Sequence, residues 1–218
     1  ISQLVQCDLS LAMLSHVKGL RLVADEETLP FADESFDLVL SVLSLHWVND
    51  LQGCLTQIRR ILKPDGLFLG AILGRGTLDE LRQAMLTAET ETLGGASPRV
   101  SPFVDAHDGG SLMQRVGFAL PVVDTGKIIL SYEDPFAMMA ELRGLGESNA
   151  LIERQNNFAR REFIKLAARQ YHEDYAGEDG RIPATFQIIT LSGWAPHDSQ
   201  QRPLPRGSGQ TPFAKVFE

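Results

Sequence analysis

The sequence has 218 residues, 44% hydrophobic and 22% charged, which is the composition of a globular protein with one domain or one domain with an insertion. Its 20 Lys and Arg residues against 28 Asp and Glu residues give a net charge of −8, which argues against a nucleic-acid partner, because such binding depends on clustered cations. Cys7 and Cys54 lack the spacing of a disulfide framework or a metal site, and no apolar run reaches the length of a membrane span.

The first half of the chain alternates short apolar strands with amphipathic helices. Ser10 caps one predicted helix, and Asn49 or Asp50 begins a second, whose apolar residues recur at helical spacing up to position 62. Strands alternating with helices in this way predict a parallel sheet with right-handed crossovers. The predicted strands of this half are 1–6, 22–24, 36–43 and 67–73, with a helix stop at 64–66.

The second half is less regular. Its predicted helices are 78–92, 111–116, 135–145 and 156–175, its predicted strands are 121–132 and 185–191, and 94–103 is a predicted loop. We expect three parts: an α/β domain formed by 1–131 and 182–195, a helical insertion or lid over 132–181, and a C-terminal tail over 196–218 that is rich in Pro and Gly.

Asp8 and Asp25 each follow a predicted strand. In an open α/β sheet, ligands bind at the carboxyl ends of the strands, where one carboxylate can accept both ribose hydroxyls of a nucleoside and a second can accept an adenine amino group. The alternative is that each Asp only ends a strand or caps a helix, since Asp is common at such corners. Taken alone, the two interpretations have similar weight.

Five short motifs in chain order resemble those of the class I S-adenosylmethionine-dependent methyltransferases. They are Asp8-Leu9-Ser10, Met13-Leu14, and the segments 25–31, 35–39 and 62–66. The resemblance implies a Rossmann-like α/β fold and S-adenosylmethionine as the cofactor. It also implies that Asp8 holds the cofactor ribose, that Leu9 lies against adenine, and that Asp25 and the Glu26 backbone meet the adenine edge.

The chain departs from this family at its front. No Gly-x-Gly loop of the kind that receives the methionine part of the cofactor lies upstream of Asp8, and Gly74-Arg75-Gly76 follows the wrong strand to be that loop. We interpret this as truncation rather than divergence. The expected fold is therefore a class I methyltransferase sheet, with its first strand and glycine loop missing from this chain, and with a helical insertion.

A second set of motifs resembles the methyltransferase-like mitochondrial complex I assembly factors over nearly the whole chain. It comprises the segments 41–50, 88–91, 94–98, 144–149 and 193–200. This resemblance implies maturation of a complex I subunit, with hydroxylation of a substrate arginine, on the matrix side of the inner mitochondrial membrane, or in the cytoplasm of a bacterium. It implies a protein partner and is compatible with peripheral membrane association. The malonyl-carrier-protein methyltransferases of biotin synthesis share the front half.

The segment after the fourth strand of the family carries the candidate reactive residues. Ser44 is expected beside the cofactor, and His46, Trp47 and Asn49 are candidate catalytic residues, because this fold directs that segment at the substrate. The ordinary pKa of a histidine suits proton transfer at neutral pH. The alternative is that His46 and Trp47 pack the corner between strand and helix, while a ring N–H bonds to the backbone.

Metal chemistry is not predicted. His172 and Asp174 have the local spacing of an iron site and His197 is a distal candidate, but the spacing is common on helix surfaces. No nucleophile elbow occurs. Two other groups are candidate surfaces for a substrate or a partner, although the first is more often a solvated face. They are the acidic Glu133, Asp134, Glu141 and Glu147, and the tail residues Trp194, His197, Ser199, Gln200 and Arg202.

Three functions remain open. The first is a cofactor-binding protein that modifies an arginine of a complex I subunit. The second is a conventional methyltransferase on a small molecule or a carrier-bound acid, which needs only alignment of acceptor and sulfonium. The third is a non-catalytic assembly chaperone.

Overall fold

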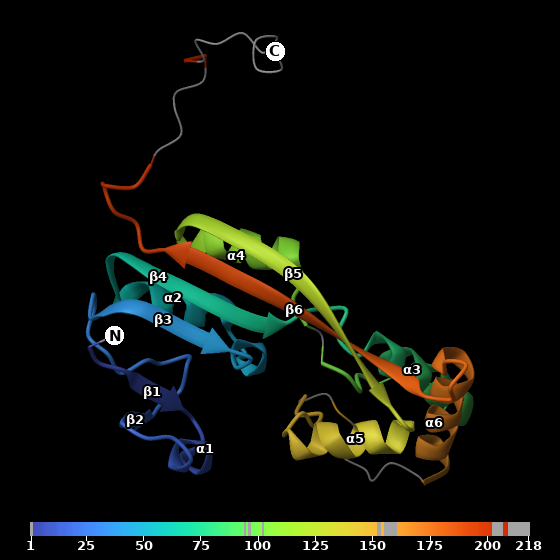
Figure 1. The fold of residues 1–218 in the computed structure, drawn as a ribbon. Helices are drawn as coiled ribbons and strands as arrows, with labels where there is room; N and C mark the ends of the chain where they lie inside the picture. The colour runs from blue at the N-terminus through green and yellow to red at the C-terminus, as the bar shows by residue number, and fades with distance from the viewer. Residues whose placement is uncertain are drawn as a thin grey trace.

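The structure is a computed structural model that describes residues 2–93, 95, 97–101, 103–151, 154, 161–201 and 207–208. Its strands form two hydrogen-bonded sheets (Figure 1). The smaller sheet pairs β1 (Val5–Asp8) with β2 (Leu20–Val23). The larger sheet has the order β3 (Phe36–Val42), β4 (Leu62–Leu73), β6 (Ile182–Trp194) and β5 (Ala119–Tyr132).

The sheets are parallel at the front of the chain and antiparallel at its end. β1 is parallel to β2 and β3 to β4, whereas β6 runs antiparallel to both β4 and β5. Figure 1 shows β1 and β2 beside the β3 edge of the larger sheet. Among the described residues, β1 pairs only with β2 and β3 only with β4, so no ladder of backbone hydrogen bonds joins the two sheets. The predicted α/β fold is confirmed.

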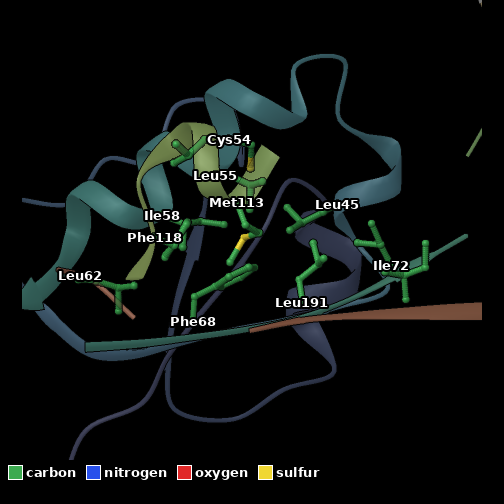
Figure 2. Packing of buried hydrophobic residues seen from close by; sticks show 13 residues of the cluster. Leu45, Cys54, Leu55, Ile58, Leu62, Phe68, Ile72, Met113, Phe118 and Leu191 are labelled. Carbon is green, nitrogen blue, oxygen red and sulfur yellow. The ribbon is translucent and has the colours of Figure 1, made fainter. Parts of the chain in front are cut away.

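Helices α2 (Leu51–Ile61) and α4 (Ala106–Val116) cover one face of the larger sheet. Figure 2 shows apolar side chains of both helices above the strands. The core is formed where these helices meet β4 and β6, and its largest fully buried members include Leu55, Phe68, Ile72, Met113 and Leu191. Burial of each such side chain contributes about 1.5 to 3 kcal/mol, so this layer fixes the position of the loop that precedes α2.

The opposite face of β3 is exposed. Leu38, Leu40 and Val42 alternate along the strand and are 38%, 56% and 73% exposed. Val39, on the other face, packs against the core below α2. The nearly continuous apolar sequence of β3 is typical of a strand covered on both faces, but here only one of its faces is covered by described residues.

The remaining helices are α1 (Leu11–Ser15), α3 (Asp79–Leu93), α5 (Pro135–Gly144) and α6 (Arg161–Tyr175), with a 3-10 turn η1 (Leu45–Trp47). In Figure 1, α3, α5 and α6 gather at the far end of the antiparallel strand pair β5–β6. Since α5 and α6 lie between β5 and β6 in the chain, they match the predicted insertion, whose status as a separate unit remains a prediction. None of the helices in the described ranges has the length and apolarity to cross a bilayer.

A buried ion pair joins α3 to the segment that follows it. Glu89 is fully buried on α3, and its two carboxylate oxygens accept hydrogen bonds from Ser97 N and Oγ at 2.8 and 2.6 Å and from Arg99 Nη2 at 2.7 Å. The Arg99 guanidinium also lies 4.7 Å from the ring centre of Phe163 on α6. Burial acts to raise the pKa of Glu89, but the hydrogen bonds from Arg99 and Ser97 outweigh it and hold that pKa below its ordinary value.

Several predicted boundaries were wrong: the strand predicted over 1–6 is Val5–Asp8, the strand predicted over 185–191 is Ile182–Trp194, and two other elements begin five residues earlier than predicted. The strand predicted over 67–73 begins at Leu62, because Leu62 pairs with Phe36 and Asp65 adopts a left-handed φ of 64° that lets the chain turn within the strand. The helix predicted over 111–116 begins at Ala106, because Asp105 accepts a hydrogen bond from Asp108 N and caps it. Part of the helix predicted over 156–175 lies outside the described residues, and α6 begins at Arg161.

Candidate functional site

Asp8 and Asp25 lie at the carboxyl ends of neighbouring strands. Asp8 pairs in register with Val23, and Ala24 N donates to Asp8 O at 3.3 Å, so the residue after it, Asp25, is close to the end of β1. Each side chain uses one oxygen in a local turn, with Ser10 N at 2.7 Å from Asp8 Oδ1 and Glu27 N at 2.9 Å from Asp25 Oδ1. The turn role that was the alternative interpretation is therefore present, and it leaves the second oxygen of each carboxylate for a ligand.

The segment after β2 is bonded to the loop after β3, here called the post-β3 loop (residues 43–50). Ser44 Oγ donates to Glu26 Oε1 at 2.6 Å. Asn49 N and Asp50 N donate to Glu27 Oε1 at 2.5 and 3.2 Å. These bonds bring the predicted cofactor residues Glu26 and Ser44 together, and they attach the smaller sheet to the larger one at one edge.

The post-β3 loop begins with a strained residue. Leu43 has a φ of 52°, in the left-handed region that a branched L-residue rarely adopts, and its N–H donates to Ala71 O of β4 at 2.8 Å. This conformation turns the chain out of β3 and into η1, which carries His46. Strain of this kind persists only where the surrounding structure holds it, and it concentrates at functional sites.

Four carboxylates, here called the acidic rim, surround the start of α2: Asp25, Glu26, Glu27 and Asp50. Burial, followed by the charges of all four, raises the pKa of the Cys54 thiol to about 12. Cys54 Sγ donates to Glu26 O at 3.1 Å, so this thiol is structural and unreactive at neutral pH. In the part of the chain that the structure describes, no ion pair joins the acidic rim to a Lys or an Arg.

His46 is buried and is held by a residue from the far side of the sequence. Its side chain is 3% exposed, and its Nε2 lies 3.2 Å from Oε1 of Glu147, which follows α5. The ring also contacts Trp47 and Phe103, with centroid distances of 5.5 and 5.9 Å. Nδ1 is buried and has no hydrogen-bond partner among the described residues. His46 therefore packs in the corner, as the alternative interpretation proposed, but it bonds to a carboxylate rather than to the backbone.

A small cavity lies beside His46. It has a volume of about 50 Å³ and is otherwise lined by apolar side chains, those of Leu45, Leu51, Ile72, Leu73, Phe103 and Val104. A cavity needs about 10 to 15 Å³ of such volume to hold one water, and sites that enclose a whole small molecule usually exceed about 300 Å³. The space therefore fits a few waters or the head of one side chain, and not a nucleoside.

The other predicted site residues are exposed. Leu9 is 63% exposed and Trp47 is 43% exposed, so Trp47 is not packed into the core as the alternative interpretation proposed. Asn49 is also exposed, and its backbone N–H rather than its side chain makes the contact with Glu27. The geometry brings Ser44, Glu26 and His46 onto one loop system and leaves the catalytic roles of Trp47 and Asn49 as predictions.

Several weaker candidates lie elsewhere. No group of three His, Cys, Asp or Glu side chains in the described ranges could hold a metal ion. Asp174 Oδ2 accepts from Gln170 Nε2, and His197 Nδ1 lies 2.7 Å from Ser199 Oγ. Of the four predicted acidic surface residues, Glu147 contacts His46. Asp134 has a structural role, because its side chain caps α5. Arg202 of the predicted tail surface is outside the described residues.

Sequence reasoning did not find the contact between His46 and Glu147, which are 101 positions apart. Each segment carries part of a family resemblance, but no local pattern relates the two. Phe103, which forms a wall of the cavity, falls in a stretch predicted only as a loop. A contact of this kind depends on where the antiparallel pair β5–β6 places the helices that connect its two strands. No local sequence pattern shows that placement.

Comparisons with known proteins place the chain in a family. A family model described as a methyltransferase domain matches residues 1–70. The mitochondrial arginine-hydroxylase NDUFAF5 of mouse is 48% identical over 200 residues, which cover 92% of this chain and 58% of that protein. A malonyl-[acyl-carrier protein] O-methyltransferase of a Methylovorus species is 34% identical over 209 residues, which cover 89% of this chain and 68% of that protein. The chain thus spans less than two thirds of the arginine-hydroxylase.

Solved structures agree on the fold. The YcgJ protein of Bacillus subtilis has a TM-score of 0.56 at 14% identity, over 89% of this chain and 83% of that one. Phosphoethanolamine N-methyltransferase 2 of Haemonchus contortus, in complex with S-adenosyl-L-methionine, has a TM-score of 0.51 at 17% identity, over 89% of this chain and 44% of that one. The chain belongs to the class I methyltransferase superfamily, in the family that includes the mitochondrial arginine-hydroxylases and the malonyl-[acyl-carrier protein] O-methyltransferases.

Proposed function

We propose that the protein binds S-adenosylmethionine at the carboxyl ends of β1 and β2 and modifies an arginine side chain of a protein partner. The observation that supports the proposal is the hydrogen bonding between the segment after β2 and the post-β3 loop. Glu26 and Glu27, directly after Asp25, bond to the post-β3 loop that presents His46. A nucleoside site and a substrate site would thereby share one wall.

The described residues fit the nucleoside half of the cofactor. Asp8 and Asp25 are expected to accept the ribose hydroxyls and the adenine amino group with the oxygens that their turns leave unused. Leu9, which is 63% exposed next to Asp8, offers an apolar surface for the adenine ring. When bound, the cofactor supplies an electrophilic methyl group in the methyltransferases of this superfamily. The chain's own part is to bind the nucleoside and to exclude water from its neighbourhood.

An arginine substrate agrees with the charges of the site. The acidic rim and Glu147 place carboxylates around the post-β3 loop, and the rim has no Lys or Arg counter-charge in the described ranges. Fields of one sign at a site attract ligands of the opposite charge. The relatives with 46% to 48% identity are named as arginine-hydroxylases, so we infer hydroxylation of that arginine. The inserted oxygen atom would come from an external oxidant, such as O2 with a two-electron reductant, and not from the methyl group of the cofactor.

The resemblance of the sequence to the complex I assembly factors supports a proposal for the partner and the compartment. We infer that the substrate is a subunit of respiratory complex I and that the protein acts in its assembly, on the matrix side of the inner mitochondrial membrane, or in the cytoplasm if the source is bacterial. The human and mouse relatives are named as mitochondrial proteins, which supports the organelle. We propose peripheral contact with the membrane, without a spanning helix, and no role for nucleic acid.

Titration of the full-length protein with S-adenosylmethionine in a calorimeter tests the cofactor. Asp8→Ala is expected to weaken binding about 10- to 100-fold, because a hydrogen bond to a charged group contributes about 1.5 to 3 kcal/mol. Asp33→Ala, at an exposed carboxylate paired with Arg60 away from the site, is the matched control. Equal affinities for Asp8→Ala and the control would contradict the assignment.

Mass spectrometry of the partner subunits tests the reaction. The expected product is a gain of one oxygen on one arginine, lost in the Asp8→Ala variant. A malonyl-[acyl-carrier protein] O-methyltransferase is the second candidate, favoured by the 34% identical relative. Release of S-adenosylhomocysteine with a carrier-bound acid, and no change of arginine mass, would support that second function. Complex I assembly that proceeds normally with Asp8→Ala would leave only a chaperone role.

A further inference from the structure

Nδ1 of His46 is a buried polar atom of the site that has no hydrogen-bond partner among the described residues. Its side chain is 97% removed from solvent, yet Nδ1 makes no hydrogen bond with any described residue. An unpaired buried polar group costs about 1 to 3 kcal/mol. A cost of that size needs a reason, and such groups are concentrated at sites that bind a ligand or a water.

The other ring nitrogen determines what Nδ1 can do. Glu147 has only acceptor oxygens when it is ionised, so Nε2 of His46 must carry the proton in the 3.2 Å contact. In the neutral ring, Nδ1 then has a lone pair and accepts a hydrogen bond. A doubly protonated ring would instead leave a buried N–H without an acceptor, which costs more because the group is charged.

We propose that Nδ1 of His46 accepts a hydrogen bond from a guanidinium N–H of the substrate, whose head enters the cavity beside the ring, and that Glu147 is the positioning residue that fixes the Nε2–H tautomer. The identity of the ligand rests on the proposed function. The cavity of about 50 Å³ has room for a planar head group, and its other walls are apolar, so they fit the faces of a guanidinium but offer it no hydrogen bond.

Charge around the loop supports a cationic ligand. Glu147 lies behind the ring, and the acidic rim lies against the two ends of the same loop, through Ser44 at one end and Asn49 at the other. A guanidinium at Nδ1 would complete a chain of hydrogen bonds from cation to imidazole to carboxylate. Such a chain compensates the buried charge, which an apolar pocket alone does not.

Glu147 also links substrate binding to the helical insertion. It follows α5 directly, and its backbone N–H donates to Leu142 O at 2.9 Å, within the last turn of that helix. Movement of α5 would therefore withdraw the carboxylate and release the ring.

Nitrogen NMR of the full-length protein with ¹⁵N-labelled histidine tests the tautomer. The His46 signals are those that disappear in His46→Phe. We expect a neutral ring protonated at Nε2, and averaging between the two tautomers in Glu147→Gln, because an amide can both donate and accept. Glu133→Gln, an exposed carboxylate before α5, should leave the spectrum unchanged. A ring protonated at Nδ1 in the unmutated protein would overturn the proposal even if Glu147→Gln failed to fold.

Methylguanidinium chloride tests the ligand in the same spectra. Its addition should move the Nδ1 resonance towards the position of a hydrogen-bonded nitrogen, whereas tetramethylammonium chloride, with the same charge and no N–H, should not. Equal shifts with both salts, or no shift with either, would overturn the ligand assignment. These spectra need neither turnover nor S-adenosylmethionine, so a failure of the proposed function, seen as lost cofactor binding or an unmodified arginine, is distinguishable from a failure here.

Discussion

Glu89 and His46 are both buried polar side chains, and they differ in how fully they are satisfied. Glu89 receives hydrogen bonds from Ser97 and Arg99 on both of its oxygens, whereas His46 has one nitrogen held by Glu147 and the other unpaired. A fully satisfied buried network rigidifies the fold, while a partly satisfied one is costly unless a ligand completes it. The comparison separates a structural polar group from a candidate functional one without reference to conservation.

The largest expected effect is on stability at Glu89. Glu89→Ala should lower the free energy of unfolding by about 3 to 5 kcal/mol, because it removes one partner of a buried pair. Glu91→Ala, at an exposed position on the same helix, should change it by less than about 0.5 kcal/mol. Chemical denaturation of the full-length protein measures both. Similar losses for the two variants would break the comparison, because Glu89 would then not be the structural group.

Acid should weaken the same ion pair. The pKa of Glu89 is below its ordinary value of 4.5 in the folded state, so its contribution is fully present above the unfolded-state pKa and is lost as the pH falls through the folded-state pKa. The wild-type protein should therefore lose more stability below pH 4.5 than Glu89→Gln, which lacks the titrating group. Denaturation midpoints across that range, with Glu91→Gln as control, test this. Parallel curves for wild type and Glu89→Gln would contradict it.

At His46, stability and activity should separate. His46→Phe keeps an aromatic ring in the corner and removes the unpaired Nδ1, while Glu147, which is 26% exposed, can be hydrated. The free energy of unfolding should change by less than about 1 kcal/mol, while the arginine product is lost. His46→Ala should destabilise by about 2 kcal/mol or more, because it leaves a cavity. Full activity in His46→Phe would show that the unpaired nitrogen has no function.

The smallest effect is expected at Leu43. Its left-handed φ of 52° costs about 1 kcal/mol for an L-residue, and glycine removes that cost but adds about 0.5 to 1 kcal/mol of backbone entropy. Leu43→Gly should therefore be within about 0.5 kcal/mol of wild type in a denaturation experiment, whereas the β-branched Leu43→Ile should be destabilised further. A stabilised Leu43→Ile would show that the loop does not need the left-handed conformation.

The parts of the fold that depend on local pattern could be predicted from the sequence. The alternation of strands and helices, the end of β1 at Asp8 and the cap of α2 at Asp50 all follow from apolar periodicity and capping residues. The start of α4 was missed because Gly109 and Gly110 obscured the cap at Asp105, although the Asp was a usable signal. No local sequence pattern shows that β6 runs antiparallel, because its direction depends on its pairing with β5.

The candidate site was predictable only in its first half. Ser44 and Glu26 were both expected near the cofactor, and the structure joins them by a hydrogen bond of 2.6 Å. The partner of His46 was not predictable, because Glu147 reaches it through the placement of α5 rather than through any spacing in the sequence. Residues that belong to one strand end could be found by pattern, and residues brought together by tertiary packing could not.

The separation of His46 and Glu147 along the chain also has a consequence for biosynthesis. The two residues are 101 positions apart, and at about 5 to 20 residues per second a ribosome needs about 5 to 20 seconds to pass from one to the other. During that interval the nascent chain has an imidazole with no carboxylate to orient it. The contact between His46 and Glu147 therefore forms only after α5 has been synthesised, so until then the ring lacks the carboxylate that orients it.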